Sequence, residues 1–167
     1  MLGYAIGKAS GKGYSDTMDD FLMQELEMPN SYTGINPSKN LHGFSRKNKD
    51  IGNWNFEKTI FSSAGDISST AKDMLTYAQK HIHEELPYLA LTHEKYVTIK
   101  KGMSRSGLAW IMMGDNDEII AHNGGTGAFD SLLMVDKRKK LAYIVLSNYL
   151  INQNKLFFTV LEEMKRL

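Results

Sequence analysis

The chain has 167 residues, of which 42% are hydrophobic and 23% charged, with a formal net charge of +1. These values are typical of one globular domain, or of part of a larger one, and the scattered Lys and Arg residues argue against a nucleic-acid partner. The absence of cysteine excludes disulfides, thiolate metal sites and a cysteine nucleophile. No apolar run approaches the ~18 residues of a membrane span.

The first half of the chain predicts two helices and a long polar segment. Apolar residues at helical spacing over Tyr14–Leu26 predict a helix that stops at Met28–Asn30. The polar segment Ser31–Ser63 shows no periodicity, and because it is long for a loop we expect it to be partly ordered against a neighbouring surface. A capping box at Thr70–Asp73 predicts a helix that runs to about His83.

The second half predicts mainly strands. Residues Pro87–Lys101 predict a short helix followed by a loop. A terminal helix follows from the apolar face of residues 156–164. The predicted strands are Gly107–Met113, Glu118–Ala121, Phe129–Val135 and Leu141–Ser147, the last two forming an antiparallel hairpin. We therefore expect one α+β unit over residues 1–167, with residues 1–100 mainly helix and loop, and residues 101–167 an antiparallel sheet plus the C-terminal helix.

The segment His122–Phe129 is the most informative part of the chain. It reads His-Asn-Gly-Gly-Thr-Gly-Ala-Phe and lies between two predicted strands. Glycine weakens a strand, so it usually marks a position where a ligand or another backbone comes close. We interpret the segment as one wall of an active-site cleft. The alternative is a glycine-rich strand with a histidine whose hydrogen bonds are satisfied in the core.

Five segments carry a pattern that covers nearly the whole chain. They are Leu2–Tyr14, Leu41–Phe44, Ser63–Asp73, Gly107–Trp110 and His122–Phe129. In this order they resemble the C-terminal half of the serine β-lactamase/penicillin-binding-protein-like family, in its branch of class C β-lactamases, D-alanyl-D-alanine carboxypeptidases and esterases. Asn148 also suits the last sheet strand of that family. The resemblance implies an incomplete β-lactamase-like fold, an antiparallel sheet with flanking helices.

Members of this family work with three groups of residues. A Ser-x-x-Lys helix start provides the nucleophile and its lysine, and a Tyr-x-Asn loop provides a base or proton relay. A strand with Lys-x-Gly or His-x-Gly binds the substrate carboxylate and the developing oxyanion. The resemblance implies that His122 faces the cleft, that Gly124 leaves room for substrate and that the N–H of Gly125 is an oxyanion donor. It also implies substrate contacts from Asn123 and Thr126.

The first two groups have no counterpart in this sequence. Tyr-x-Asn does not occur, and the resemblance places it shortly upstream of Leu2, with the nucleophile helix further upstream. The single Ser-x-x-Lys string puts Ser69 and Lys72 one helical turn apart. Because a helix cap at Thr70 and Asp73 explains the same stretch, we interpret Ser69 and Lys72 as a decoy nucleophile.

Other ionisable residues favour no metal or cofactor. His81, His83, Glu84, Glu85 and His93 offer ligand chemistry, but residues i and i+2 of a helix diverge. Histidines near a helix C-terminus are also favoured by the helix dipole. We therefore expect no metal ion, and no cofactor.

The two tryptophans are interpreted mainly as packing residues. They are Trp54 and Trp110. Because Trp110 lies in a predicted strand, it is the better candidate to face the cleft and contact substrate.

Three functions remain open. In the first, the chain is the C-terminal portion of a serine hydrolase acting on a β-lactam, a D-alanyl peptide or an ester, and is inactive alone. In the second, it is a non-catalytic binding module. In the third, it is a half-enzyme completed by a second chain. Family resemblance implies an extracytoplasmic or cell-envelope location, although no export signal opens the sequence. Because Leu141–Ser147 would be an apolar edge strand, we expect a homo-oligomer or pairing with a missing N-terminal half.

Overall fold

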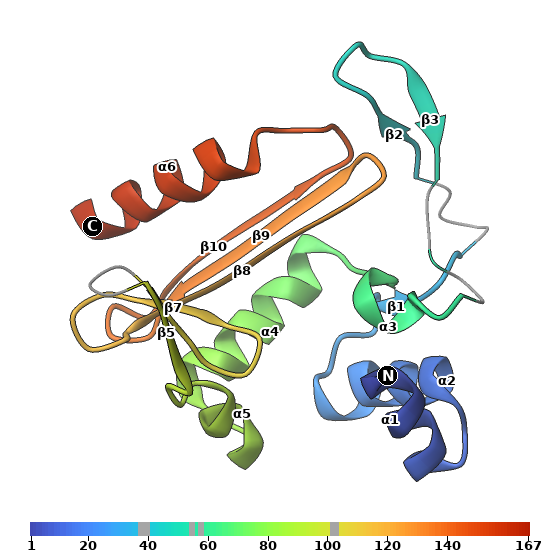
Figure 1. The fold of residues 1–167 in the computed structure, drawn as a ribbon, viewed down its shortest axis with the longest axis horizontal. Coiled ribbons are helices and arrows are strands. Elements are labelled where there is room, and N and C mark those ends of the chain that lie inside the picture. The colour runs from blue at the N-terminus through green and yellow to red at the C-terminus, as the bar shows by residue number, and fades with distance from the viewer. Residues whose placement is uncertain (37–40, 54–55, 57–58, 101–103) are drawn as a thin grey trace.

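A six-stranded antiparallel sheet forms the centre of the protein, in the order β10-β9-β8-β7-β6-β5. The computed structural model describes residues 1–36, 41–53, 56, 59–100 and 104–167. Helices α4 (Ala71–His83) and α6 (Gln153–Arg166) cover opposite faces of the sheet (Figure 1). The predicted α+β class is confirmed. The strands are β5 (Val97–Lys100), β6 (Ser104–Ser106), β7 (Ile111–Met113), β8 (Ile119–Thr126), β9 (Phe129–Asp136) and β10 (Leu141–Ser147).

Strand β9 shows why both faces of the sheet are covered. Its side chains alternate between the two faces, as in any strand. Leu132 and Met134 pack in the same cluster as Val160 of α6. Leu133 pairs with the other cluster, which contains Ala78 of α4. The unbroken apolar run of β9 is therefore buried between two helices, and the predicted hairpin of β9 and β10 is confirmed.

Both covering helices begin with a side-chain cap. Thr70 Oγ1 accepts a hydrogen bond from the N–H of Asp73 at the start of α4, and Asn152 Oδ1 accepts one from the N–H of Lys155 at the start of α6. A cap of this kind contributes about 1 kcal/mol. Helix α4 ends where Glu84 adopts a left-handed φ of 49°. The predicted helix and its N-cap are confirmed.

The N-terminal elements form a smaller layer beside α4. Leu22, Leu26 and Met28 make an apolar cluster, and Met74 and Tyr77 of α4 pack against it. The elements that precede α4 are α1 (Leu2–Ser10), α2 (Tyr14–Asp20), the π-helix η1 (Phe21–Glu25), β1 (Tyr32–Thr33), β2 (Gly43–Phe44), β3 (Asp50–Gly52), α3 (Ser62–Gly65) and β4 (Ile67–Ser68), and α5 (Pro87–Thr92) follows α4. Of these, β2 and β3 lie outside the layer, near the end of β10.

The described parts of the long polar segment are partly ordered, as expected. Strand β1 pairs with β4, and β2 pairs with β3. Phe44 of β2 donates its N–H to the carbonyl of Asn148 at 2.8 Å and accepts from the N–H of Leu150 at 3.3 Å. The β2–β3 hairpin is thereby attached beyond the end of β10 (Figure 1). Trp54 lies outside the described residues.

Several predicted boundaries were wrong. The strand expected over Gly107–Met113 begins only at Ile111, because the N–H of Gly107 bonds the carbonyl of Trp110 in a turn. The loop expected after α5 contains β5, so the sheet begins before residue 101. No element was predicted over Leu2–Ser10, where α1 forms. Glycine at position 3 lowers helix propensity, but a side chain there would overlap Ser63 of α3.

Candidate functional site

The glycine-rich segment is the second half of strand β8. The strand predicted over Glu118–Ala121 continues to Thr126, so the glycines lie within the sheet. They stay in the ladder because each residue is opposite a residue of β9, ending with Thr126 opposite Phe129. Gly127, with φ 59°, and Ala128 make the two-residue turn of this hairpin.

Alternation along β8 divides the predicted site residues between two faces. Ile120 packs in the cluster of α4, whereas Ala121 packs in the cluster of α6. Residues 122, 124 and 126 therefore share the α4 face, and residues 123 and 125 share the α6 face. The imidazole of His122 is exposed on the α4 face.

One backbone edge of this half-strand is open. Strand β7 pairs with β8 only over residues 119–121, and in the described part of the chain no strand pairs with that edge beyond Ala121. The carbonyl of Glu118 accepts from the N–H of Lys137 on the β9 side. Because backbone groups alternate between the two edges, even-numbered residues of β8 bond β9. The N–H of Gly125 consequently points toward the open edge.

A pocket of about 340 Å³ lies beside His122 on the α4 face. Met74 and Tyr77 of α4 line one side, and Ser131 of β9 lines another. Trp110 contributes to the same pocket. The pocket combines apolar walls with the imidazole of His122 and the hydroxyl of Ser131.

Trp110 lies immediately before β7, so the prediction that it belongs to a strand was wrong. Its ring is only 6% exposed and stacks on Tyr77 with centroids 6.4 Å apart. It also meets the rings of His81 and His93 at steep angles. Most of the surface of this side chain is therefore buried against other aromatic rings, and only a small part of it lines the pocket.

Asn123 and Thr126, the other predicted contact residues, have different surroundings. The amide of Asn123 donates to Gln153 Oε1 at 2.7 Å on the α6 face, so its side chain points away from the pocket. Thr126 lies beside α3, since a Cβ on Gly65 would be 3.2 Å from Thr126 Cγ2. Of these two residues, Thr126 shares the face of His122.

Ser69 and Lys72 are not arranged as a nucleophile and its lysine. The hydroxyl of Ser69 lies 2.7 Å from Ser31 Oγ, which donates to the buried carboxylate of Asp73 at 2.8 Å. Lys72 is exposed, and no hydrogen bond joins it to Ser69 among the described residues. The Asp73 carboxylate also accepts from the N–H of Asn30, so this stretch ties the segment after η1 to the start of α4.

Substituting Ser69 by alanine is expected to leave reactivity unchanged and to lower the free energy of unfolding by about 1 kcal/mol, the value of one hydrogen bond. The chain is treated with a fluorophosphonate or a fluorescent penicillin, and covalent labelling is measured by mass spectrometry beside a known serine hydrolase. Labelling of the wild-type chain that disappears in Ser69→Ala would contradict this interpretation.

The histidines near the end of α4 form a buried chain of hydrogen bonds. His93 Nδ1 lies 3.1 Å from Glu84 Oε1, and His93 Nε2 lies 2.8 Å from His81 Nδ1. Because a carboxylate only accepts, His93 Nδ1 carries the hydrogen, and in the neutral pair His81 Nδ1–H donates to His93 Nε2. That leaves His81 Nε2 as the buried atom with no hydrogen-bond partner in the described structure. His83 is exposed instead.

These residues do not form a metal centre. Within the described ranges, no group of three or more His, Cys, Asp or Glu side chains is arranged to hold a metal ion. Burial is the main cause that lowers the pKa of His81 to about 3, and the neighbouring His93 adds to it. Burial also lowers the pKa of His93, against the opposing effect of Glu84.

Sequence analysis missed Asp130 and Gln153. Asp130, 5% exposed, sits opposite Gly125 in the hairpin, and the first residue of α6, Gln153, bonds it. An aspartate between Phe129 and an otherwise apolar run was the available signal, since a buried carboxylate requires a donor.

The sequence model of the Beta-lactamase family matches residues 1–155. A mutant class C beta-lactamase is similar to this chain with a TM-score of 0.84 and 21% identity, covering 99% of this chain and 56% of that one. A D-alanine carboxypeptidase from Burkholderia cenocepacia gives 0.85 and 15%, covering 100% and 58%. An octameric penicillin-binding protein homologue from Pyrococcus abyssi gives 0.72 and 19%, covering 89% and 36%.

These likenesses show the fold, and the chain spans little more than half the length of the first two structures. A search of curated proteins gives no match. Across the described residues, none of the helices combines the length and the apolar character needed to cross a membrane.

Proposed function

This chain belongs to the beta-lactamase family, and we propose that it forms the substrate-binding wall of a serine acyl hydrolase of that family. The observation that carries the proposal is the open backbone edge of β8 at Gly125, beside an exposed His122 and a pocket. Residues 1–167 are then the C-terminal portion of one β-lactamase-like domain, completed by further polypeptide.

Each residue of the wall has a chemical role in acyl transfer. The N–H of Gly125 donates to the oxyanion of the tetrahedral intermediate, a contribution typically worth ~10²–10³ in rate. His122 supplies a donor or a positive charge for the substrate carboxylate. Gly124 has no side chain to block the substrate, since only Ser131 Oγ lies near its Cβ position, at 3.3 Å. Thr126 contacts the polar end of the substrate.

The attacking hydroxyl comes from outside the described site. A serine hydroxyl needs an adjacent base, and neither Ser69 nor any Tyr-x-Asn loop of this sequence provides that arrangement. The isolated chain is therefore expected to be inactive. Substrates in the complete enzyme are β-lactams, D-alanyl peptides or esters, which share a carbonyl attacked by serine.

Reconstitution tests this proposal. The chain is co-expressed with an N-terminal polypeptide that carries a Ser-x-x-Lys helix and a Tyr-x-Asn loop, taken from the sequence in frame before its first codon or from a class C β-lactamase. We expect hydrolysis of nitrocefin or of a p-nitrophenyl ester by the pair and by neither half alone. A stable complex without turnover that binds a D-alanyl-D-alanine peptide would instead indicate a binding module. A stable complex without turnover or binding would contradict the proposal.

A homo-oligomer is also expected in the absence of the completing polypeptide. Strand β10 lies at the edge of the sheet, with no strand on its outer side in the described ranges, and Leu146 is 43% exposed. Exposed apolar edges recruit a second chain. The octameric Pyrococcus abyssi homologue supports assembly in this fold.

Light scattering at a protein concentration of ~100 µM, where exposed edges associate, measures the assembly. Leu146→Lys is expected to lower the mass to that of a monomer, because the lysine charge opposes edge pairing. Phe158→Lys is the matched control, since Phe158 is 56% exposed and belongs to α6 rather than to β10. A monomeric wild-type chain, or equal masses for the two variants, would contradict this expectation.

A further inference from the structure

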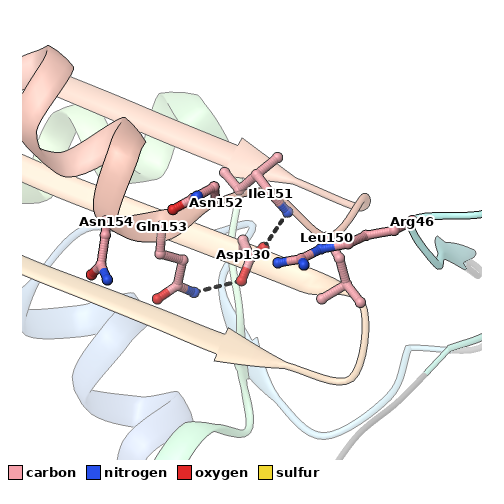
Figure 2. A pocket seen from close by; sticks show the side chains of 7 residues that line it. All are labelled: Arg46, Asp130, Leu150, Ile151, Asn152, Gln153 and Asn154. Atoms are coloured by element: carbon pink, nitrogen blue, oxygen red, sulfur yellow. Dashed lines mark hydrogen bonds between the residues drawn. The ribbon is translucent and has the colours of Figure 1, made fainter.

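The α6 face of the glycine strand is held by one side chain from the start of α6. Gln153 Nε2 donates to the carbonyl of Gly124 at 2.8 Å and also to Asp130 Oδ1. Gln153 Oε1 accepts from the Asn123 amide at 2.7 Å. Figure 2 shows Gln153 reaching across to Asp130, whose other oxygen accepts from the N–H of Ile151 at 2.8 Å. One glutamine thus bonds three residues of the β8–β9 hairpin, namely Asn123, Gly124 and Asp130.

The fit against Gly125 is tight. A Cβ at this position would lie 2.6 Å from Gln153 Nε2 and 2.7 Å from Asp130 Oδ1, closer than real Cβ contacts. The two polar side chains therefore occupy the space behind Gly125 that any other residue would need. They approach from the α6 face, opposite the pocket beside His122.

The charge and burial of Asp130 make this contact specific. The carboxylate is 5% exposed, and each of its oxygens has a donor. Removing a donor from a buried carboxylate is unfavourable, since the charge is left without its hydrogen bond. Gln153 is consequently fixed in the orientation that also bonds Gly124.

We infer that Gln153 and Asp130 are positioning residues that hold the backbone of Gly124 and Gly125 so that the Gly125 N–H stays aimed at the open edge. The inference rests on the proposed function, because only there is the Gly125 N–H an oxyanion donor. A strand segment with two adjacent glycines and one open edge has few restraints of its own. Gln153 and Asp130, called the clamp below, supply this restraint from the α6 face, opposite the pocket.

Amide ¹⁵N relaxation of the isolated chain tests the clamp directly. In the wild-type chain the order parameter of Gly125 is expected near the ~0.85 of rigid backbone, and in Gln153→Ala below ~0.6. Order at Met134 and Val160 is expected to be unchanged in the same spectra, which separates local loosening from unfolding. Should Gln153→Ala unfold, Asn123→Ala removes one bond of the same glutamine and is expected to lower the order parameter of Gly125 by a smaller amount.

A second substitution of Gln153 and a control substitution of Asn154 complete the test. Gln153→Glu preserves size but has no N–H to donate at neutral pH and places a carboxylate beside Asp130, so it is expected to loosen Gly125 at least as much as alanine. Asn154→Ala is the control. Asn154 lines a pocket of about 440 Å³ together with Gln153 and Asp130, but forms no hydrogen bond to β8 in the described structure. It is expected to leave Gly125 rigid. Rigid Gly125 amides in both Gln153 variants would overturn the inference.

Kinetics of the reconstituted enzyme separate this inference from the proposed function. Gln153→Ala is expected to lower kcat about tenfold with KM changed less than twofold, because an aimed donor acts mainly in the transition state. Loosening of Gly125 together with an inactive wild-type pair leaves the clamp standing and counts against the proposed function. An active wild-type pair whose kcat is unaffected by Gln153→Ala would overturn the clamp alone.

Discussion

Between pH 6.5 and pH 3 the free energy of unfolding is expected to fall by up to roughly 5 kcal/mol through His81. Burial holds the pKa of His81 near 3, so the folded chain keeps this imidazole neutral while the unfolded chain protonates it below about 6.5. The unfolded state then binds more protons, and stability falls as the pH falls. His93 acts in the same direction, since its pKa is also lowered.

The groups around the pair decide how specific this effect is. Glu84 stabilises a protonated His93, whereas Lys137 opposes protonation of both rings. On the remaining side lie the rings of Tyr77 and Trp110, and among the described residues neither forms a hydrogen bond with His81 Nε2. When both His81 and His93 are protonated, Glu84 is the negatively charged group of this hydrogen-bonded chain that stabilises their positive charges.

Urea unfolding at pH 7, 5.5 and 4 measures the loss. His81→Gln retains a group that bonds His93 but cannot titrate, so the variant is expected to lose much less stability on acidification than the wild-type chain. His83→Gln, an exposed position two residues along the same helix, is the control and is expected to follow the wild-type chain. Equal pH dependence for the wild-type chain and His81→Gln would contradict the prediction.

In the reconstituted enzyme His122→Ala is expected to lower kcat/KM by about 10²–10³-fold, the usual effect of losing a catalytic donor. The reason is its position. The side chain of His122 is exposed beside the pocket, and His122 lies two residues before Gly124, in the part of β8 that the substrate is proposed to reach. His122→Lys is expected to retain activity to within about tenfold, because a lysine also donates to a carboxylate. Nitrocefin turnover measures both variants.

The control for this prediction is His83→Ala, which removes an exposed imidazole far along α4 from the pocket-lining residues. It is expected to change kcat/KM by less than twofold. Equal activity of His122→Ala and the wild-type chain in an active pair would remove His122 from the substrate wall.

The sequence predicted the main elements of this fold where the signal was local. Helix α4 followed from apolar spacing and from the Thr70 cap, and the hairpin of β9 and β10 followed from two apolar runs around a charged turn. Helix α1 was missed because it contains two glycines, and the contacts that require them, of Gly3 with Ser63 of α3 and of Gly7 with Gly13 and Tyr14, form only in the folded chain. Strand β5 was missed because it has only four residues, although the β-branched run Val-Thr-Ile is typical of a strand.

The candidate site was predictable as a segment but not as a geometry. The glycines and His122 singled out residues 122–129, while the periodicity that ended the strand at Ala121 gave no sign that pairing with β9 carries it to Thr126. Which face of the sheet carries the side chain of Asn123 could therefore not be predicted, because it depends on this continuation of the strand. Gln153 could not be found from the sequence, because it meets Gly124 only after the β10–α6 connection brings α6 back over the sheet.

The open edge at Gly125 is the central feature of this account, and an NMR titration tests it most directly. A ¹⁵N-labelled chain is titrated with a D-alanyl-D-alanine peptide or a β-lactam up to ~10 mM, a range that detects binding of only about 3 kcal/mol. We predict saturable amide shifts at residues 122–126, largest at Gly125, with smaller shifts at Ser131. Saturable shifts confined to other surfaces, or none at Gly125, would contradict the account.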